Sequence, residues 1–214
     1  MRITKLGHCC LIVEVQGQKF LSDPGMFTRE SHEKVTGLDA ILITHEHADH
    51  FHTESLQTIL TLNPTARVLC NTGVGAILAV AGVPHEVLND GEKTAVGGVN
   101  IAAYGSLHQP IHSSLPPMEN TGFLIAEELW YPGDAYYHLT AKPRAVALPM
   151  GGPWMKFAEA IDYALLLKPK LCFPVHDAVL TDMMRIMGEQ RGAAILAKND
   201  IEFVVPEIGK SYEI

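Results

Sequence analysis

The stretch from Ile41 to His52 reads ILITHEHADHFH and joins an apolar run to a dense cluster of imidazoles and carboxylates. Residues 39–45 (DAILITH) form a short, almost wholly apolar segment, which is typical of a β-strand buried on both faces. The chain has eleven histidines, and this stretch alone holds four of them. We therefore predict that a buried strand delivers a histidine cluster to its carboxyl end.

The spacing H-x-H-x-D-H, formed by His45, His47, Asp49 and His50, is typical of metal ligands. Side chains at positions i and i+2 of a strand end project to the same side, so His45 and His47 can reach one ion. Asp49 and His50 lie where the chain turns into a helix, where they can reach a second ion. Imidazole and carboxylate ligands suit zinc, manganese, iron or nickel. A solvated histidine-rich loop is the alternative, which the tight spacing disfavours.

The rest of the chain mixes strands and helices in both halves. Strands are predicted at residues 2–7, 9–15, 19–23, 66–70, 93–96, 98–105, 145–150 and 171–175, and within residues 121–134, where Glu127 and Glu128 are expected at a hairpin turn. Helices are predicted at residues 53–62, with Thr53 as the N-cap, and at 74–82, 156–168 and 181–190. This order predicts an α/β fold, a four-layer αββα sandwich of two packed sheets with helices outside. With 214 residues, 47% of them hydrophobic, residues 1–214 are expected to form a single domain.

Composition limits the kinds of binding partner and the cellular compartment that we expect for this protein. A formal charge of −8 leaves no general basic surface, so we expect a small-molecule substrate and no nucleic acid. No apolar stretch of about eighteen residues occurs and the start of the chain lacks a signal-peptide pattern, so we expect no membrane association and a cytoplasmic protein. Four cysteines without CxxC spacing are expected to be buried apolar thiols: Cys9, Cys10, Cys70 and Cys172. The oligomeric state is not readable from the sequence.

The whole chain resembles the metallo-β-lactamase-fold hydrolases. Within that superfamily it is most similar to the branch of L-ascorbate-6-phosphate lactonase and small uncharacterised metal-dependent hydrolases. The matching stretches are LGHCCLIVE near the start, LSDPGMF after the first hairpin, and LPMGGPWMKFAEAIDYALLLKPKLCFPVHD near the end.

The resemblance implies a ligand set for two cations. It places His45, His47 and His108 on one metal, Asp49, His50 and His176 on the other, and Asp134 between them. His112 competes with His108 for the third-histidine position, and we favour His108 because it lies nearer the preceding strand. The resemblance also implies two divalent metal ions, zinc before manganese, iron or nickel.

These ligands predict a metal-dependent hydrolase that uses a metal-bound hydroxide to cleave a small ester, lactone or phosphoester. Two cations lower the pKa of a shared water to about 7 and polarise the electrophile, while Asp49 can orient the nucleophile. Two alternatives stay open: a phosphodiesterase or nuclease of the same fold, and a non-catalytic metal-binding protein. Redox catalysis at two irons is disfavoured, because that branch carries Glu where this chain has His47.

Five residues outside the ligand set are candidates for the site. His8, at the tip of the first strand, either points into the pocket as a catalytic residue or packs in the core. Asp23 is expected to accept a hydrogen bond from a ligand histidine. The substrate pocket is expected to include His112, Trp154 and Lys156.

Overall fold

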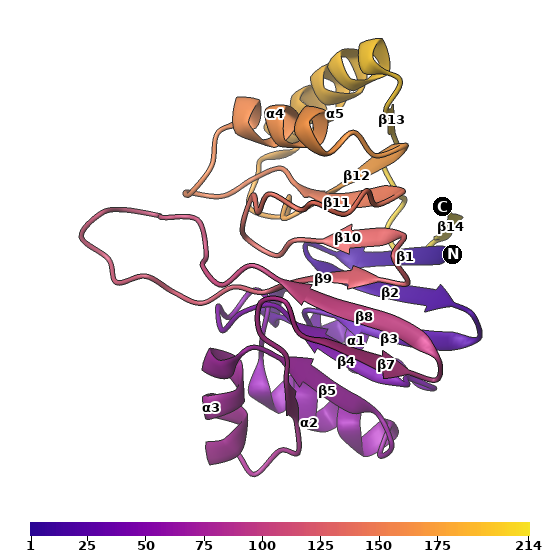
Figure 1. Cartoon of the computed structure of the whole chain (residues 1–214), viewed down its shortest axis with the longest axis vertical. Helices are drawn as coiled ribbons and strands as arrows, with labels where there is room; N and C mark the ends of the chain where they lie inside the picture. The colour runs from indigo at the N-terminus through magenta and orange to yellow at the C-terminus, as the bar shows by residue number, and fades with distance from the viewer.

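Two seven-stranded sheets, packed face to face, form the centre of the computed structural model, which describes residues 1–214 (Figure 1). The first sheet has the order β14-β1-β2-β3-β4-β5-β6. Its strands, in chain order, are β1 (Arg2–Gly7), β2 (Cys10–Val15), β3 (Gln18–Ser22), β4 (Ala40–Ile43), β5 (Arg67–Cys70), β6 (Glu86–Val87) and β14 (Ser211–Glu213). β3, β4, β5 and β6 run parallel, whereas β14, β1, β2 and β3 pair antiparallel.

The second sheet has the order β13-β12-β11-β10-β9-β8-β7. Its strands are β7 (Lys93–Val96), β8 (Val99–Tyr104), β9 (Gly122–Ile125), β10 (Leu129–Tyr131), β11 (Ala145–Pro149), β12 (Leu171–Val175) and β13 (Glu202–Phe203). The four strands from β10 to β13 are parallel.

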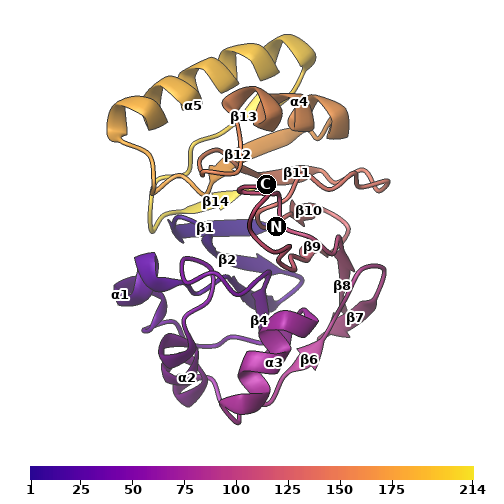
Figure 2. The same cartoon turned by 90° about the vertical axis from the view of Figure 1, so that its left-hand side faces the viewer.

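Helices cover the outer face of each sheet, as the two views show (Figure 1, Figure 2). The first sheet carries η1 (Met26–Thr28), α1 (Arg29–His32), α2 (Thr53–Leu62) and α3 (Thr72–Val80), and the second carries α4 (Phe157–Leu167), α5 (Asp182–Leu196) and η2 (Ala197–Asn199). The predicted α/β class and four-layer αββα sandwich are therefore confirmed. No helix combines the length and the apolar character that a membrane crossing requires.

Local predictions were wrong in two places. The N-cap of α2 is His52 and not Thr53, because the His52 ring accepts the backbone N–H of Ser55. α5 continues to Leu196, beyond its predicted end at residue 190. The sequence also left out η1, α1 and the short edge strands β6, β13 and β14, which are too short for hydrophobic periodicity to reveal them.

The apolar side chains gather in three layers that match this architecture. A cluster of 24 buried residues, including Ile3, Phe20 and Phe173, fills the space between the sheets. Clusters of 15 and 14 buried residues join the second sheet to α4 and α5 and the first sheet to α2 and α3. Every residue of β4 is buried because it is covered on both faces, which explains its unbroken apolar sequence.

The carboxyl ends of β1, β4, β8, β10 and β12 meet at one edge of the sandwich, the edge that faces the viewer in Figure 2. The histidine stretch follows β4, and the other predicted ligands follow strands of the second sheet. This edge therefore positions the candidate site.

Candidate metal centre

The structure brings the seven predicted ligand residues together at this edge, in two overlapping groups. In the first group, His45, His47, His108 and Asp134 each offer a ligand atom within 4.8 Å of the others. The Nε2 atom of His45 lies 3.0 Å from Nδ1 of His47. The Nε2 atom of His108 lies 3.3 Å from Oδ2 of Asp134.

The second group shares Asp134 with the first. The Nε2 atom of His176 lies 2.9 Å from Oδ2 of Asp134 and 3.4 Å from Oδ2 of Asp49. The Nε2 atom of His50 lies 3.2 Å from Oδ1 of Asp134. Asp134 thus stands between the two groups, where a bridging carboxylate would be needed.

The buried Asp23 carboxylate orders the ligand loop after β4. Its Oδ1 accepts the backbone N–H of Thr44, and its Oδ2 accepts the Thr44 hydroxyl, the Tyr131 hydroxyl and Nδ1–H of His50. Because the Thr44 hydroxyl donates to Asp23, its oxygen can accept Nδ1–H of His45, 3.0 Å away. With Nδ1 engaged, both imidazoles turn Nε2 toward Asp134. Asp23 takes the acceptor position predicted for it.

Several buried ligand atoms have no hydrogen-bond partner, which tests whether cations fit. His108 uses Nδ1–H on the carbonyl of Gln109, so its Nε2 presents a lone pair to the Asp134 carboxylate. His50, with its Nδ1–H bonded to Asp23, also turns Nε2 toward this carboxylate. Neither Nε2 has a partner, and Oδ1 of Asp134 has none either. Buried polar atoms that have no partner are costly, and a divalent cation between them would supply one. The donor set fits metal ions.

Charge within the cluster keeps both carboxylates ionised. Burial alone raises the pKa of Asp134, but the imidazoles of His50, His108 and His176 outweigh burial and hold that pKa well below its usual range. The pKa of Asp49 is likewise lowered, against burial, by His176 and His8. Burial and the nearby charge of His50 lower the pKa of His45, which keeps that imidazole neutral. Against burial, Cys9 and the neighbouring carboxylates raise the pKa of His50 well above its usual range and that of His176 to about 10, so a bound cation would take the place of these protons.

His8 lies beside the second group. Of the two positions predicted for its side chain, the structure favours the one that faces the site. Its Nδ1 accepts the backbone N–H of Ala178, and its Nε2 lies 3.1 Å from Oδ2 of Asp49. Nε2 is therefore the protonated nitrogen and donates to Asp49. Lys5, buried in β1, donates to Oδ2 of Asp177 at 2.5 Å and ties down the turn that carries His176.

The predicted pocket residues are dispersed. Trp154 is buried and its ring lies 5.7 Å from those of His108 and His176, so it covers the imidazoles. His112 is exposed on the loop after His108, where its ring bonds to Ser114. Lys156 is exposed at the start of α4, where its backbone N–H donates to Glu159.

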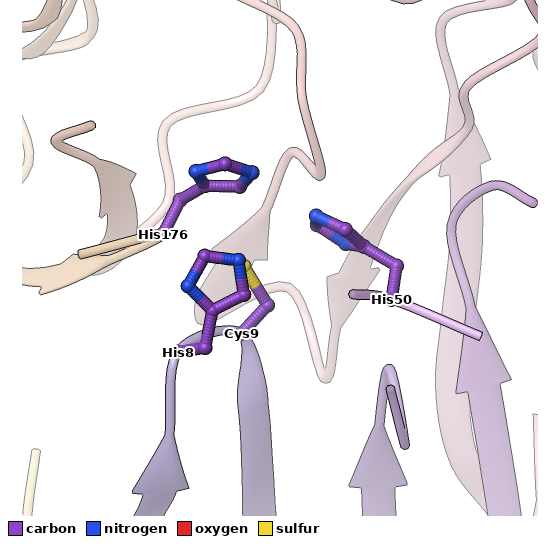
Figure 3. A group of neighbouring side chains, drawn as sticks. All are labelled: His8, Cys9, His50 and His176. Carbon is purple, nitrogen blue, oxygen red and sulfur yellow. The ribbon is translucent and has the colours of Figure 1, made fainter. Parts of the chain in front are cut away.

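Cys9 is a free, buried thiol in the apolar cluster between the sheets, as predicted, but the sequence did not predict that its sulfur also lies against the ligand histidines. Figure 3 shows its sulfur among the rings of His8, His50 and His176. Burial disfavours the thiolate, but the three imidazoles outweigh burial and lower the pKa of Cys9 to about 6. The one available signal was its position, immediately after His8 at the tip of β1.

Comparison with known proteins agrees with this fold. Residues 2–176 match the family described as Beta-lactamase superfamily domain. Protein Rv0786c of Mycobacterium tuberculosis is 35% identical over 185 residues, which cover 84% of this chain and 85% of that protein. A UPF0173 metal-dependent hydrolase of Methanospirillum hungatei is 28% identical and covers 100% of this chain and 99% of its own length.

A solved structure extends the likeness to the fold. Igni18, described as a metallo hydrolase from the archaeon Ignicoccus hospitalis, superposes with a TM-score of 0.77 at 21% identity, covering 100% of this chain and 98% of that one. Together with the family match over residues 2–176, these similarities show the family of the chain. It belongs to the β-lactamase superfamily, as a metal-dependent hydrolase with the metallo-β-lactamase fold.

Proposed function

We propose that this hydrolase cleaves a small ester, lactone or phosphoester at a centre of two divalent cations, zinc before manganese, iron or nickel. One observation carries the proposal: buried imidazole nitrogens of His50 and His108 face the ionised carboxylate of Asp134 without a hydrogen-bond partner, in two overlapping groups. His45, His47 and His108 would hold one cation, Asp49, His50 and His176 the other, and Asp134 would touch both. When bound, the cations would lower the pKa of water to about 7 and polarise the electrophile.

Asp49 is the residue best placed to orient the attacking water. Its Oδ2 is occupied by Nε2–H of His8, and its side chain is 22% exposed, so it reaches the mouth of the site. His8 acts on the reaction by fixing this carboxylate. Trp154 covers the imidazoles of His108 and His176 and excludes bulk water there, which strengthens every electrostatic interaction in the site.

A cavity beside the first group indicates the character of the substrate. It measures about 360 Å³ and lies under the long loop between β8 and β9, which extends to the left in Figure 1. Its lining consists of His47, Leu107, His108, Gln109, Pro110, Ile111, His112, Ser113, Leu115, Pro116, Pro117 and Met118. Another cavity, of about 220 Å³ against α5, is lined by none of the seven ligand residues. We infer that the larger cavity takes an apolar part of the substrate, such as an acyl or alkyl group.

The same lining disfavours the nuclease alternative. The cavity wall contains no Lys and no Arg, whereas a phosphate backbone needs several cations along its path. Lys156, the one basic residue predicted for the pocket, is exposed outside this wall. The proposed partner is therefore a small molecule and not a nucleic acid.

We infer that the protein acts in the cytoplasm as a single domain. All four cysteines are free and buried, which suits a reducing compartment. Cell fractionation with a tagged chain tests the location, and limited proteolysis that releases a stable fragment would contradict the single domain.

A turnover panel tests the reaction. Zinc-loaded protein is assayed with lactones, with p-nitrophenyl esters of increasing acyl length, and with bis-p-nitrophenyl phosphate. We expect hydrolysis of a lactone or ester, with kcat/KM rising with acyl length because each buried methylene contributes about 0.8 kcal/mol. Metal-loaded protein that turns over nothing would support the non-catalytic alternative, and oxygen consumption by iron-loaded protein would support redox chemistry.

A matched pair of variants tests the ligand set. His108→Ala should lower the zinc content measured by elemental analysis, because it removes one of three imidazoles from the first group. His112→Ala, from the same loop, should keep the wild-type zinc content and change KM for apolar esters. The reverse pattern would mean that His112 is the ligand.

A further inference from the structure

Cys9 packs in the apolar core between the sheets and also lies against the second ligand group. It stands in the turn between β1 and β2, is 2% exposed, and places Sγ within 4.8 Å of a ring nitrogen from each of His8, His50 and His176 (Figure 3). Zinc–sulfur and zinc–nitrogen bonds of about 2.3 and 2.0 Å put donors of one cation about 3 to 4 Å apart. This cluster can therefore close on one ion with small side-chain shifts.

One histidine beside Cys9 has a buried ring nitrogen without a hydrogen-bond partner. His50 is fully buried and its Nε2 has no hydrogen-bond partner. Figure 3 shows the nitrogen-bearing edge of its ring turned toward His176 and Cys9. The backbone of Cys9 is held in place, because its carbonyl accepts the hydroxyls of Ser22 at 3.0 Å and Tyr131 at 2.8 Å. The backbone of Cys9 is thus held where its sulfur lies within 4.8 Å of a ring nitrogen of His50.

His8 is not the donor that completes this cluster. Its Nδ1 accepts the backbone N–H of Ala178, and its Nε2–H donates to Asp49. A histidine with both nitrogens engaged in this way has no lone pair to give to a cation. The sulfur of Cys9 is therefore the atom of this cluster that can bind a cation together with His50 and His176.

We propose that Cys9 is a thiolate ligand of the second cation, bound together with His50 and His176. The proposal rests on the metal centre argued above and adds a soft sulfur donor to a site of imidazoles and carboxylates. On binding, the S–H proton is released to solvent and a sulfur–metal bond forms. The added thiolate favours zinc and cobalt over manganese at this position, since manganese prefers oxygen ligands.

Cobalt substitution tests the proposal by a spectroscopic signal that does not depend on turnover. Cobalt-loaded wild-type protein should show visible d–d bands, which report occupancy, and a near-ultraviolet thiolate-to-cobalt charge-transfer band. Cys9→Ala should lose the charge-transfer band and keep visible bands from the remaining ligands. Cys172→Ala is the matched control, because Cys172 is also a free, buried cysteine but belongs to neither group of metal-ligating side chains, and it should keep both signals.

The outcomes separate this proposal from the metal centre itself. Visible bands without a charge-transfer band in the wild type would overturn the Cys9 assignment and leave the centre standing. A charge-transfer band that persists in Cys9→Ala would also overturn it. Absence of any cobalt band would count against the centre. If Cys9→Ala does not fold, X-ray absorption of zinc-loaded wild-type protein decides, since a sulfur neighbour at about 2.3 Å is required.

Discussion

Asp23 shows how one carboxylate can set the chemistry of a whole ligand loop. It is fully buried and accepts hydrogen bonds from the backbone and hydroxyl of Thr44, from Tyr131 and from His50. These bonds determine which nitrogen of His50 carries the proton and where its free lone pair points. The sequence predicted an acceptor at Asp23, but only the fold shows that Tyr131, from the other sheet, shares it.

Asp23→Asn should weaken zinc binding by about 10- to 100-fold, the usual cost of losing such a supporting hydrogen bond. The physical reason is that an amide cannot accept from His50, Thr44 and Tyr131 as an ionised carboxylate does. Competition with a fluorescent chelator measures the affinity. Asp39→Asn is the control, because Asp39 accepts the backbone N–H of Lys19 away from the cluster. Equal affinities for the two variants would contradict the role of Asp23.

His32 is a buried histidine for which the sequence offers no partner. Its side chain is fully buried in α1, with Nδ1 2.9 Å from the Thr28 hydroxyl and Nε2 without a partner. Burial lowers the pKa of His32 to about 4, so the imidazole stays neutral in the folded protein. In the unfolded chain its pKa is near 6.5.

The free energy of unfolding should therefore fall as pH decreases from about 6.5 to 4, because His32 binds a proton in the unfolded chain and not in the folded protein. At pH 5 the loss from His32 is on the order of 2 kcal/mol. His32→Asn, which keeps a polar partner for Thr28, should lose that much less stability between pH 7 and pH 5. Urea unfolding of metal-free protein at the two pH values measures it. Identical losses would show that His32 does not titrate as argued.

At the scale of elements, the corner after β3 packs against the turn that precedes α2. Met26 donates its backbone N–H to Ala48 at 2.8 Å, and a Cβ built on Gly25 would lie 1.9 Å from the carbonyl oxygen of Asp49. Only glycine permits this approach of two backbones. The LSDPGMF stretch thus holds the HADH turn in place, a contact between elements that neither sequence motif reveals alone.

Gly25→Ala should push Asp49 and His50 out of position and cost about 1–3 kcal/mol of stability, as overpacking does. It should also lower zinc content, because the second group loses two ligands at once. Gly17→Ala is the control: a Cβ there meets nothing within 4 Å, although φ is +81°, so it should retain zinc at a cost of about 1 kcal/mol. Chemical denaturation and elemental analysis of both variants provide the test.

At the scale of the whole molecule, the candidate centre joins the two sheets. His45, His47, Asp49 and His50 follow β4 of the first sheet, whereas His108, Asp134 and His176 follow β8, β10 and β12 of the second. A cation bound between them contacts both layers of the sandwich. Metal binding and folding should therefore be linked.

Zinc should stabilise the folded protein by about 2.7 kcal/mol when its free concentration is 100 times the dissociation constant. Removal of zinc by a chelator should accordingly lower the thermal midpoint, as measured by circular dichroism. His45→Ala, which breaks the first group, should respond less to the chelator. A midpoint that does not change with zinc would mean that the ligands do not bind metal in the native state.

Much of this protein could be predicted from its sequence because the relevant signals are local. Strand and helix periodicity predict the main elements. The H-x-H-x-D-H spacing after β4 indicates a loop of metal ligands without information from the rest of the chain. The resemblance supplied the order of the remaining ligands. Where local signals were weak, in short edge strands such as β14 or at the cap of α2, the predictions failed or were absent.

Only the tertiary structure decided which side chains share one space. Cys9 and His176 are far apart along the chain, and their meeting depends on how the second sheet closes over the first. The protonated nitrogen of His8 depends on Ala178, and the apolar cavity depends on the path of the loop after β8. Such contacts arise from packing across the whole sandwich, so no periodicity or spacing within a single segment encodes them.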